Sequence, residues 1–157
     1  MNFYFKGFHK NIKGDKDGLG VCSFSIPEFG LFHRSVVLDK DEVLLDYMSL
    51  LLLFEFITQN SSFFERINFF TICGPKNILQ YVKSDNKVPK KVEAFKNTSN
   101  AYIWKIKQDM RTQIDFLEIS EEKNRAFFNI DSLKVDKNLA RYLTLLTKER
   151  DDTYKSR

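Results

Sequence analysis

The chain has 157 residues and a mass of 18.6 kDa, which suits one domain. Hydrophobic residues make up 43%, with only 6 Gly and 3 Pro, so disordered, collagen-like and low-complexity classes are excluded. Lys and Arg number 25 against 21 Asp and Glu, and the net charge of +4 permits binding to a phosphate polymer without requiring it. We expect a single domain over residues 1–150 and a flexible C-terminal tail over 151–157.

Nothing in the sequence predicts a membrane segment or a zinc site. The longest apolar run, residues 50–54, is far shorter than the ~20 residues of a membrane span. The first residues alternate and form no apolar leader. Cys22 and Cys73 lie in apolar runs, far from His9 and His33, so we expect buried, reduced thiols and no metal ligands. These features favour a cytoplasmic protein that binds no cofactor and no membrane.

The first part of the chain has the pattern of a three-stranded antiparallel sheet. Aromatic and polar residues alternate over 1–8, which is typical of a strand. Turn-forming residues over 11–18 precede a second predicted strand, 19–26. A four-residue reversal at Pro27–Gly30 leads to a third predicted strand, 31–38, and the short connections predict a meander.

A long apolar helix is predicted next, followed by a buried strand. Asp39 can cap the helix N-terminus, with Glu42 three residues later, and apolar residues recur at helical spacing through Thr58. The helix is apolar over most of its circumference, so we expect it to be buried between the sheet and other helices. The short apolar run within residues 65–73 predicts a strand that is buried on both faces and parallel to a neighbour.

The remaining elements are predicted less regularly. Residues 85–100 are polar and Lys-rich around Pro89. The expected helices and strand are a helix over 75–84, a short helix over 90–95, a helix over 101–111, a strand over 112–119, and helices over 121–133 and 138–148.

This order of elements resembles the ribonuclease H-like fold, and five local strings are similar to its motifs. They are Phe3-Tyr4-Phe5-Lys6-Gly7, similar to aromatic-x-Asp-Gly on the first strand; Gly18-Leu19-Gly20-Val21, similar to the start of the second; Asp46-Tyr47-Met48-Ser49-Leu50, where the first helix carries Glu; Ile72-Cys73-Gly74-Pro75, where the fourth strand ends in Asp-Ser; and Asn124-Arg125-Ala126-Phe127-Phe128, similar to the closing Asn-x-x-Ala-Asp. The resemblance implies an α/β protein with a mixed five-stranded sheet, three antiparallel strands followed by strands alternating with helices, flanked by helices.

The departures from this family bear on function. Its members cleave the RNA strand of RNA–DNA hybrids, or resolve related structures, with two Mg²⁺ ions held by carboxylates. By the resemblance, the degenerate active-site positions are Lys6, Asp46, Gly74 and Phe127 or Phe128, so one acid remains. No Asp or Glu occurs between Glu65 and Asp85, so no shift of alignment restores the fourth-strand acid.

We therefore expect no catalytic residues, no metal and no enzyme activity. Acids elsewhere leave a relocated active site open, although turn formation and helix capping are sufficient explanations for them. These acids are Asp15, Asp17, Asp39, Asp41 and Glu42.

Nucleic-acid binding without cleavage is the leading functional hypothesis, with an RNA–DNA hybrid or another nucleic acid as the partner. Residues 83–111 carry seven Lys and one Arg against three acids, where some family members carry a basic handle. The expected contact residues are Lys6, Lys10, Lys87, Lys90, Lys91, Lys96, Tyr102 and Trp104. The simpler interpretation is that these Lys side chains are only solvated and that Trp104 packs in the core, as aromatics at helical spacing usually do.

The alternative hypothesis is a protein-interaction or scaffold domain, including a homodimer, with no role in nucleic-acid binding. The chain has 16 Phe, too many for all to lie inside so small a protein. We expect Phe29, Phe32, Phe63 and Phe64 to be exposed.

Overall fold

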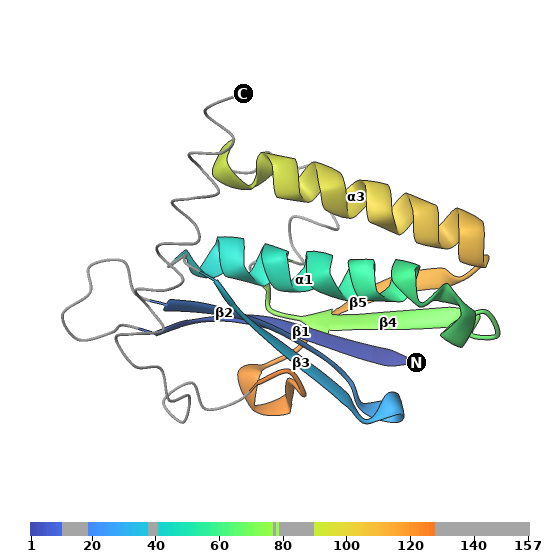
Figure 1. Cartoon of the computed structure of the whole chain (residues 1–157), viewed down its shortest axis with the longest axis horizontal. Helices are drawn as coiled ribbons and strands as arrows, with labels where there is room; N and C mark the ends of the chain where they lie inside the picture. The colour runs from blue at the N-terminus through green and yellow to red at the C-terminus, as the bar shows by residue number, and fades with distance from the viewer. Residues whose placement is uncertain (11–18, 38–40, 77, 79–89, 128–157) are drawn as a thin grey trace.

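A computed structural model describes residues 1–10, 19–37, 41–76, 78 and 90–127. One mixed sheet of five strands lies under two helices, which are stacked on the same face (Figure 1). The strands are β1 (Asn2–Lys10), β2 (Leu19–Ile26), β3 (Leu31–Val37), β4 (Phe69–Gly74) and β5 (Gln113–Glu118). The helices are α1 (Glu42–Gln59) and α3 (Lys90–Met110), with 3-10 turns η1 (Pro27–Phe29), η2 (Ser61–Phe63) and η3 (Glu121–Lys123).

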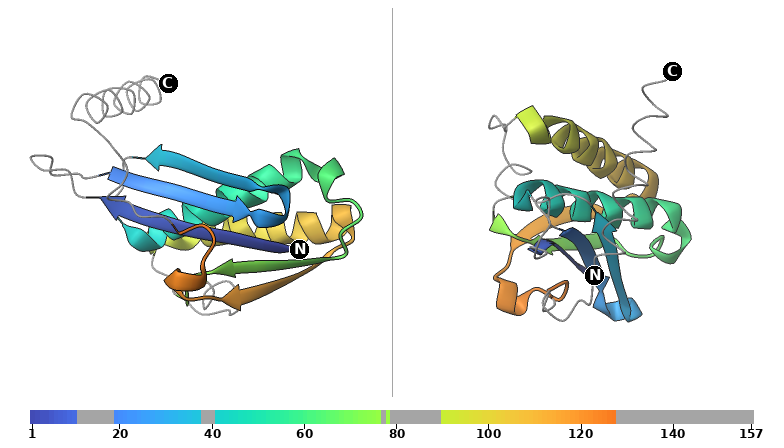
Figure 2. Two further views of the ribbon diagram at one scale, coloured as in Figure 1. Left: turned by 90° about the horizontal axis from the view of Figure 1, so that it is seen from below. Right: turned by 60° about the vertical axis from the view of Figure 1, so that its left-hand side comes forward.

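The strand order is β3-β2-β1-β4-β5, which places β1 at the centre of the sheet (Figure 2, left). β1 pairs antiparallel with β2, and β2 with β3, so the predicted meander is confirmed. β4 lies parallel to both β1 and β5, as the buried apolar run predicted. The α/β class with a mixed five-stranded sheet is therefore confirmed.

β1 and β4 run side by side for only a short distance. Their pairing covers Asn2, Phe3 and Tyr4 of β1, opposite residues 71–73 of β4. Beyond Tyr4, the pairing of β1 continues only with β2, as far as Lys10 opposite Leu19. The two parallel strands thus separate at the position of Lys6, and an edge of β1 is left for other groups to approach.

Helix α1 is the centre of the core. Its N-cap is Asp41, whose Oδ1 accepts a hydrogen bond from Leu44 N–H at 3.2 Å. The expected cap, Asp39, lies outside the described residues and before the cap that is used, so that expectation is wrong by two positions. The buried residues of α1 pack over β1 and β2, with many Phe rings around them. This aromatic core includes Phe3, Phe5, Phe24, Phe54, Phe64 and Phe70.

Helix α3 is one continuous helix over Lys90–Met110, where we expected two helices separated by a polar stretch. Asn97, Thr98 and Asn100 have poor helix propensity and interrupted the apolar pattern, but the helix continues through them. Val92 and Ile106 of α3 are buried in the core cluster, so packing against α1 supports the whole length. Tertiary contacts here outweigh local propensity.

Other expectations are corrected or fall outside the described part. Residues 121–127 form η3 and a turn rather than the start of the expected helix. Most of the helix expected at 75–84, the helix at 138–148, the rest of 121–133 and the tail at 151–157 lie outside the described residues. The single-domain boundary at 150 and the cytoplasmic location stay predictions. Within the described part, no helix has both the length and the apolar character needed to cross a membrane.

Candidate functional site

The candidate site lies where α1 crosses the centre of β1. Gly7 permits this crossing, because a Cβ there would lie 2.5 Å from the backbone carbon of Leu45. Gly7 N–H donates a 2.7 Å hydrogen bond to Oδ1 of Asp46. The close approach of helix and strand therefore places the Asp46 carboxylate at the edge of β1 that β4 has left.

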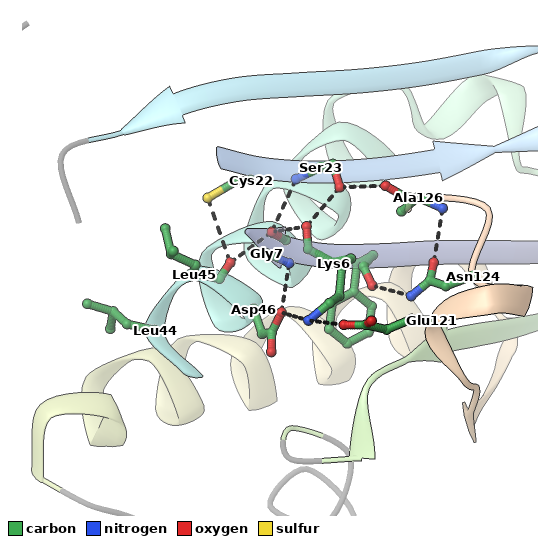
Figure 3. A network of polar contacts seen from close by, with 12 residues as sticks. Lys6, Gly7, Cys22, Ser23, Leu44, Leu45, Asp46, Glu121, Asn124 and Ala126 are labelled. Carbon is green, nitrogen blue, oxygen red and sulfur yellow. Dashed lines mark hydrogen bonds and ion pairs between the residues drawn. The ribbon is translucent and has the colours of Figure 1, made fainter. Parts of the chain in front are cut away.

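Lys6 and Asp46 are brought together at this point. Lys6 Nζ is 3.7 Å from Asp46 Oδ1 and also 3.7 Å from Glu121 Oε1 (Figure 3). The Lys6 and Asp46 side chains are 10% and 3% exposed, whereas that of Glu121 is 66% exposed. The Nζ atom also lies 5.7 Å from the centroid of the Phe8 ring, within reach of a cation–π interaction. The site therefore holds a nearly buried ammonium beside two carboxylates and an aromatic ring, all of which favour a positive charge.

Glu121 reaches Lys6 because the turn after β5 is anchored to β1. Asn124 Nδ2 donates to the carbonyl oxygen of Phe5 at 3.1 Å, and Asn124 Oδ1 accepts from Ala126 N–H at 3.0 Å. Asn124 and Ala126 are both buried. Residues far apart in sequence are thereby fixed together, and η3 is held beside β1.

Two buried serines fix the backbone of Lys6. The hydroxyl groups of Ser23 and Ser49 lie 2.8 Å and 3.0 Å from the Lys6 carbonyl oxygen, within hydrogen-bond distance. Ser23 Oγ is also 2.9 Å from the carbonyl oxygen of Ala126, which links the turn after η3 to β2. Figure 3 shows Lys6 among groups from β2 (Ser23), α1 (Asp46) and the turn after η3 (Ala126). The ammonium therefore projects from a rigid base.

Burial dominates the protonation of Asp46. It raises the pKa of this carboxyl from 3.8 to about 6, while Lys6 and the Gly7 N–H lower it and Glu42 raises it. The Lys6 ammonium and the amide compensate for only part of the desolvation. Near neutral pH, Asp46 is mainly ionised and paired with Lys6.

Gly74, which the family resemblance assigns to the site, has an aromatic ring beside it. A Cβ on Gly74 would lie 2.2 Å from Cε1 of Phe5, which is fully buried in the core. Any side chain at Gly74 requires the Phe5 ring to move. The neighbouring Cys73 thiol is buried, and burial raises its pKa, so it is unsuited to act as a nucleophile.

The residues present do not fit a pair of magnesium ions. Mg²⁺ needs oxygen ligands in a nearly octahedral arrangement, and here an ammonium stands between the two carboxylates. Among the described residues, no group of three His, Cys, Asp or Glu side chains could hold a metal ion. Of the acids considered for a relocated site, Asp41 serves as the cap of α1, Glu42 is in its first turn, and Asp15, Asp17 and Asp39 lie outside the described residues.

The structure thus places the predicted degenerate positions as follows. Lys6 and Asp46 converge, and Gly74 lies beside the Phe5 ring. Phe127 is 44% exposed and its ring meets that of Phe8 edge-on at 5.6 Å, while Phe128 lies outside the described residues. Sequence reasoning missed Glu121, because only the anchoring of η3 to β1 brings it to Lys6.

Of the expected nucleic-acid contacts whose side chains the structure describes, Lys6 lies in the site on β1 and the others lie on α3. Lys6 is ion-paired inside the site, whereas Lys90 is exposed at the start of α3 and Lys96 is half-buried. The side chains of Lys10 and Lys91, and all of Lys87, lie outside the described part.

The two aromatic candidates on α3 differ in exposure. Tyr102 is half-buried, with its ring 6.2 Å from that of Phe54 on α1. Trp104 is 66% exposed, so the interpretation that it packs in the core is wrong. Its side chain lies off the stripe formed by Ile103, Ile106 and Met110, which faces the protein. Trp104 therefore belongs to the solvent-facing side of α3.

No protein-family model and no curated protein matches the chain. Solved structures do match. RNase H1 from the halophilic archaeon Halobacterium salinarum NRC-1 has a TM-score of 0.55 and 10% identity, with 80% of this chain and 89% of that chain covered. LC11-RNase H1, isolated from compost by a metagenomic approach, has a TM-score of 0.55 and 18% identity, with 78% and 86% covered. The LC11 enzyme in complex with RNA/DNA hybrid has a TM-score of 0.53 and 17% identity, with 79% and 88% covered.

Proposed function

We propose that this chain, whose fold is ribonuclease H-like, binds nucleic acid through a basic surface on α3 and does not cleave it. The observation that carries the proposal is the exposed indole of Trp104 on a helix rich in cations. Residues 90–111 contain six Lys or Arg and only two acids. An aromatic ring among cations suits a ligand that offers both phosphates and bases.

The surroundings of Trp104 favour such a ligand. The residues one helical turn away, Asn100, Ala101, Lys107 and Gln108, are exposed, and none of them is acidic. Lys107 can attract a phosphate, the amide side chains can hydrogen-bond to a base or sugar, and Ala101 leaves the indole face accessible. Base stacking on such a ring is worth ~1–3 kcal/mol per base.

The absence of cleavage is argued from the site on β1. Two-metal hydrolysis needs carboxylates on several rigid elements around the ions. By the family resemblance, Lys6 and Gly74 stand at two of those positions, and the structure has an ammonium at the first and the Phe5 ring beside the second. Lys6 was also expected to contact phosphate, but its ammonium faces Asp46 and Glu121, so the proposed interface does not include it.

The test is a fluorescence-anisotropy titration of labelled single strands, duplex DNA and RNA–DNA hybrid, with Mg²⁺ or Mn²⁺ present, followed by analysis of the same samples for cleavage. We expect binding that weakens steeply with salt, because phosphate contacts release counterions, and intact products. Lys90→Glu with Lys105→Glu should weaken binding at least ~10-fold. The matched control is Arg66→Glu with Lys76→Glu, which reverses two exposed charges outside α3.

Two results contradict the proposal. If no nucleic acid binds at low salt, the basic surface is only solvated. If chelator-sensitive cleavage occurs, the interpretation of the site on β1 fails.

A protein-interaction role is the second candidate, because aromatic side chains gather at one end of the sheet. Phe29, Phe32 and Phe63 are 45%, 39% and 67% exposed, and the rings of Phe29 and Phe63 meet edge-on at 6.5 Å. Phe64, also expected to be exposed, is fully buried and packs against Phe3 and Phe70. Sedimentation equilibrium of the wild type and of Phe29→Ser with Phe63→Ser tests for a dimer: a wild-type dimer that the variant abolishes favours this role.

A further inference from the structure

The Lys6 ammonium lies where two carboxylates and an aromatic face converge. Asp46 comes from α1 and Glu121 from η3, and each has an oxygen 3.7 Å from Nζ. The Phe8 ring centroid is 5.7 Å from the same atom. We propose that Lys6 is a resident cation: its ammonium takes the place of a metal ion in this site and keeps divalent cations out.

The surroundings of Nζ are those of a cation site rather than of an ordinary surface ion pair. The Lys6 side chain is only 10% exposed, so its charge needs local compensation. Asp46, 3% exposed, needs a positive partner for the same reason. Glu121, which is mostly exposed, closes the arrangement from the solvent side. The two buried charges thus depend on each other.

The polypeptide holds this cation in a fixed position. Ser23 and Ser49 lie within hydrogen-bond distance of the Lys6 carbonyl oxygen, and Asn124 donates to that of the preceding residue, Phe5. Asp46 is held by the Gly7 N–H at 2.7 Å. A divalent ion entering between the two carboxylates would have to displace the Lys6 ammonium, whose backbone on β1 is held by these contacts.

The site thus holds an ammonium between two anionic groups, both within reach of the same cation. Replacing the ammonium by a carboxylate should create a divalent-cation site, because Asp46 and Glu121 are already positioned. Lys6→Asp would place a third carboxylate beside them, and three carboxylates together favour a hard divalent cation. This inference does not depend on nucleic-acid binding, and it is tested without nucleic acid.

The experiment measures Mn²⁺ binding by isothermal titration calorimetry and by EPR of free Mn²⁺, with thermal unfolding in Mn²⁺ or EDTA alongside. For the wild type, we expect no Mn²⁺ binding at this site and the same unfolding temperature in Mn²⁺ as in EDTA. For Lys6→Asp, we expect one Mn²⁺ bound with a dissociation constant of ~0.1–1 mM, in the range of weak oxygen-ligand sites, and an unfolding temperature that rises with Mn²⁺. Lys6→Asp with Asp46→Asn should lose this binding, and Lys90→Asp, a change at an exposed lysine, should not gain it.

The outcomes separate clearly. The proposal is overturned if the wild type binds Mn²⁺ in a manner that Asp46→Asn abolishes, or if Lys6→Asp has the wild-type circular dichroism spectrum and binds none. If Lys6→Asp is unfolded in EDTA, recovery of its spectrum on adding Mn²⁺ supports the proposal. If it does not recover, Lys6→Met decides: stabilisation of this variant by Mn²⁺, absent in the wild type, supports a resident cation, and equal behaviour overturns it.

Discussion

Replacing Lys6 by Met should destabilise the protein, and much more at pH 8 than at pH 5. Met keeps an unbranched side chain, one atom shorter than that of Lys, and removes the ammonium with its charge and its hydrogen-bond donors. The Asp46 carboxyl, 3% exposed, then loses the Lys6 ammonium and keeps the hydrogen bond from the Gly7 N–H as compensation. The cost therefore depends on whether Asp46 is ionised.

The pKa of Asp46 sets the pH at which the cost appears. Because burial raises it from 3.8 to about 6, the folded protein takes up this proton at a higher pH than the unfolded chain does. The contribution of Asp46 to stability is thus most favourable at low pH and is lost as pH rises from about 4 through 6. A shift of about two units corresponds to about 3 kcal/mol already in the wild type.

Without the ammonium, the pKa of Asp46 should rise further, and the ionised carboxylate becomes more costly. Breaking a buried ion pair by removing one partner costs roughly 3–5 kcal/mol. We expect a loss of about 3 kcal/mol at pH 8, the lower end, because Asp46 can take up a proton instead. At pH 5, Asp46 is mostly protonated in the wild type, so the loss should be about 1 kcal/mol or less.

Urea unfolding followed by far-UV circular dichroism at both pH values measures these losses. Lys105→Met is the control, since it removes an exposed charge on α3 and should change stability little at either pH. Asp46→Asn combined with Lys6→Met should recover part of the loss at pH 8, because no buried charge is then left unpaired. An equal loss at both pH values, or none at pH 8, would refute this account of the site.

Three further predictions follow from the fold and the surface. Gly7→Ala should cost about 3 kcal/mol in urea unfolding, because the added methyl meets the backbone of α1 at 2.5 Å; an unchanged midpoint would show that the helix can move away. Gly74→Ala should destabilise the protein, and it should do so less in a Phe5→Leu background, because the ring that the new methyl meets is then absent. Additive effects of the two changes in a double-mutant cycle would contradict this steric reasoning. Trp104 is the one tryptophan of the chain, so binding of an unpaired strand should quench the intrinsic fluorescence, and Trp104→Ala should weaken binding several-fold; binding without quenching would remove the indole from the interface.

Much of the sheet could be predicted from the sequence because its signals are local. The alternation along the first strand, the turn at Pro27–Gly30 and the apolar run before Gly74 are each visible within a short segment of the chain. The continuous helix α3 was not predictable in the same way, since Asn97–Asn100 favours a break and only packing against α1 overrides it. The exposure of Trp104 depended on the rotation of that helix, which is a matter of tertiary packing.

The candidate site was predictable only in part. Lys6 and Asp46 stand out because the resemblance to known motifs assigns them to neighbouring positions. Glu121 has no such signal, because its place beside Lys6 depends on the Asn124 side chain bonding to β1 more than a hundred residues earlier. The exclusion of side chains at Gly74 depends on the orientation of the Phe5 ring, which no local pattern specifies.

Because β1 separates early from β4, the Asp46 side chain accepts a backbone hydrogen bond that a neighbouring strand would otherwise accept. Where β4 no longer pairs with β1, the Gly7 amide finds the Asp46 carboxylate instead, at 2.7 Å. One side chain of a helix thus continues the hydrogen-bonding ladder of a sheet by one rung. The exchange of this single amide hydrogen with deuterated solvent therefore reports how firmly α1 is seated on β1, independently of the rest of the strand.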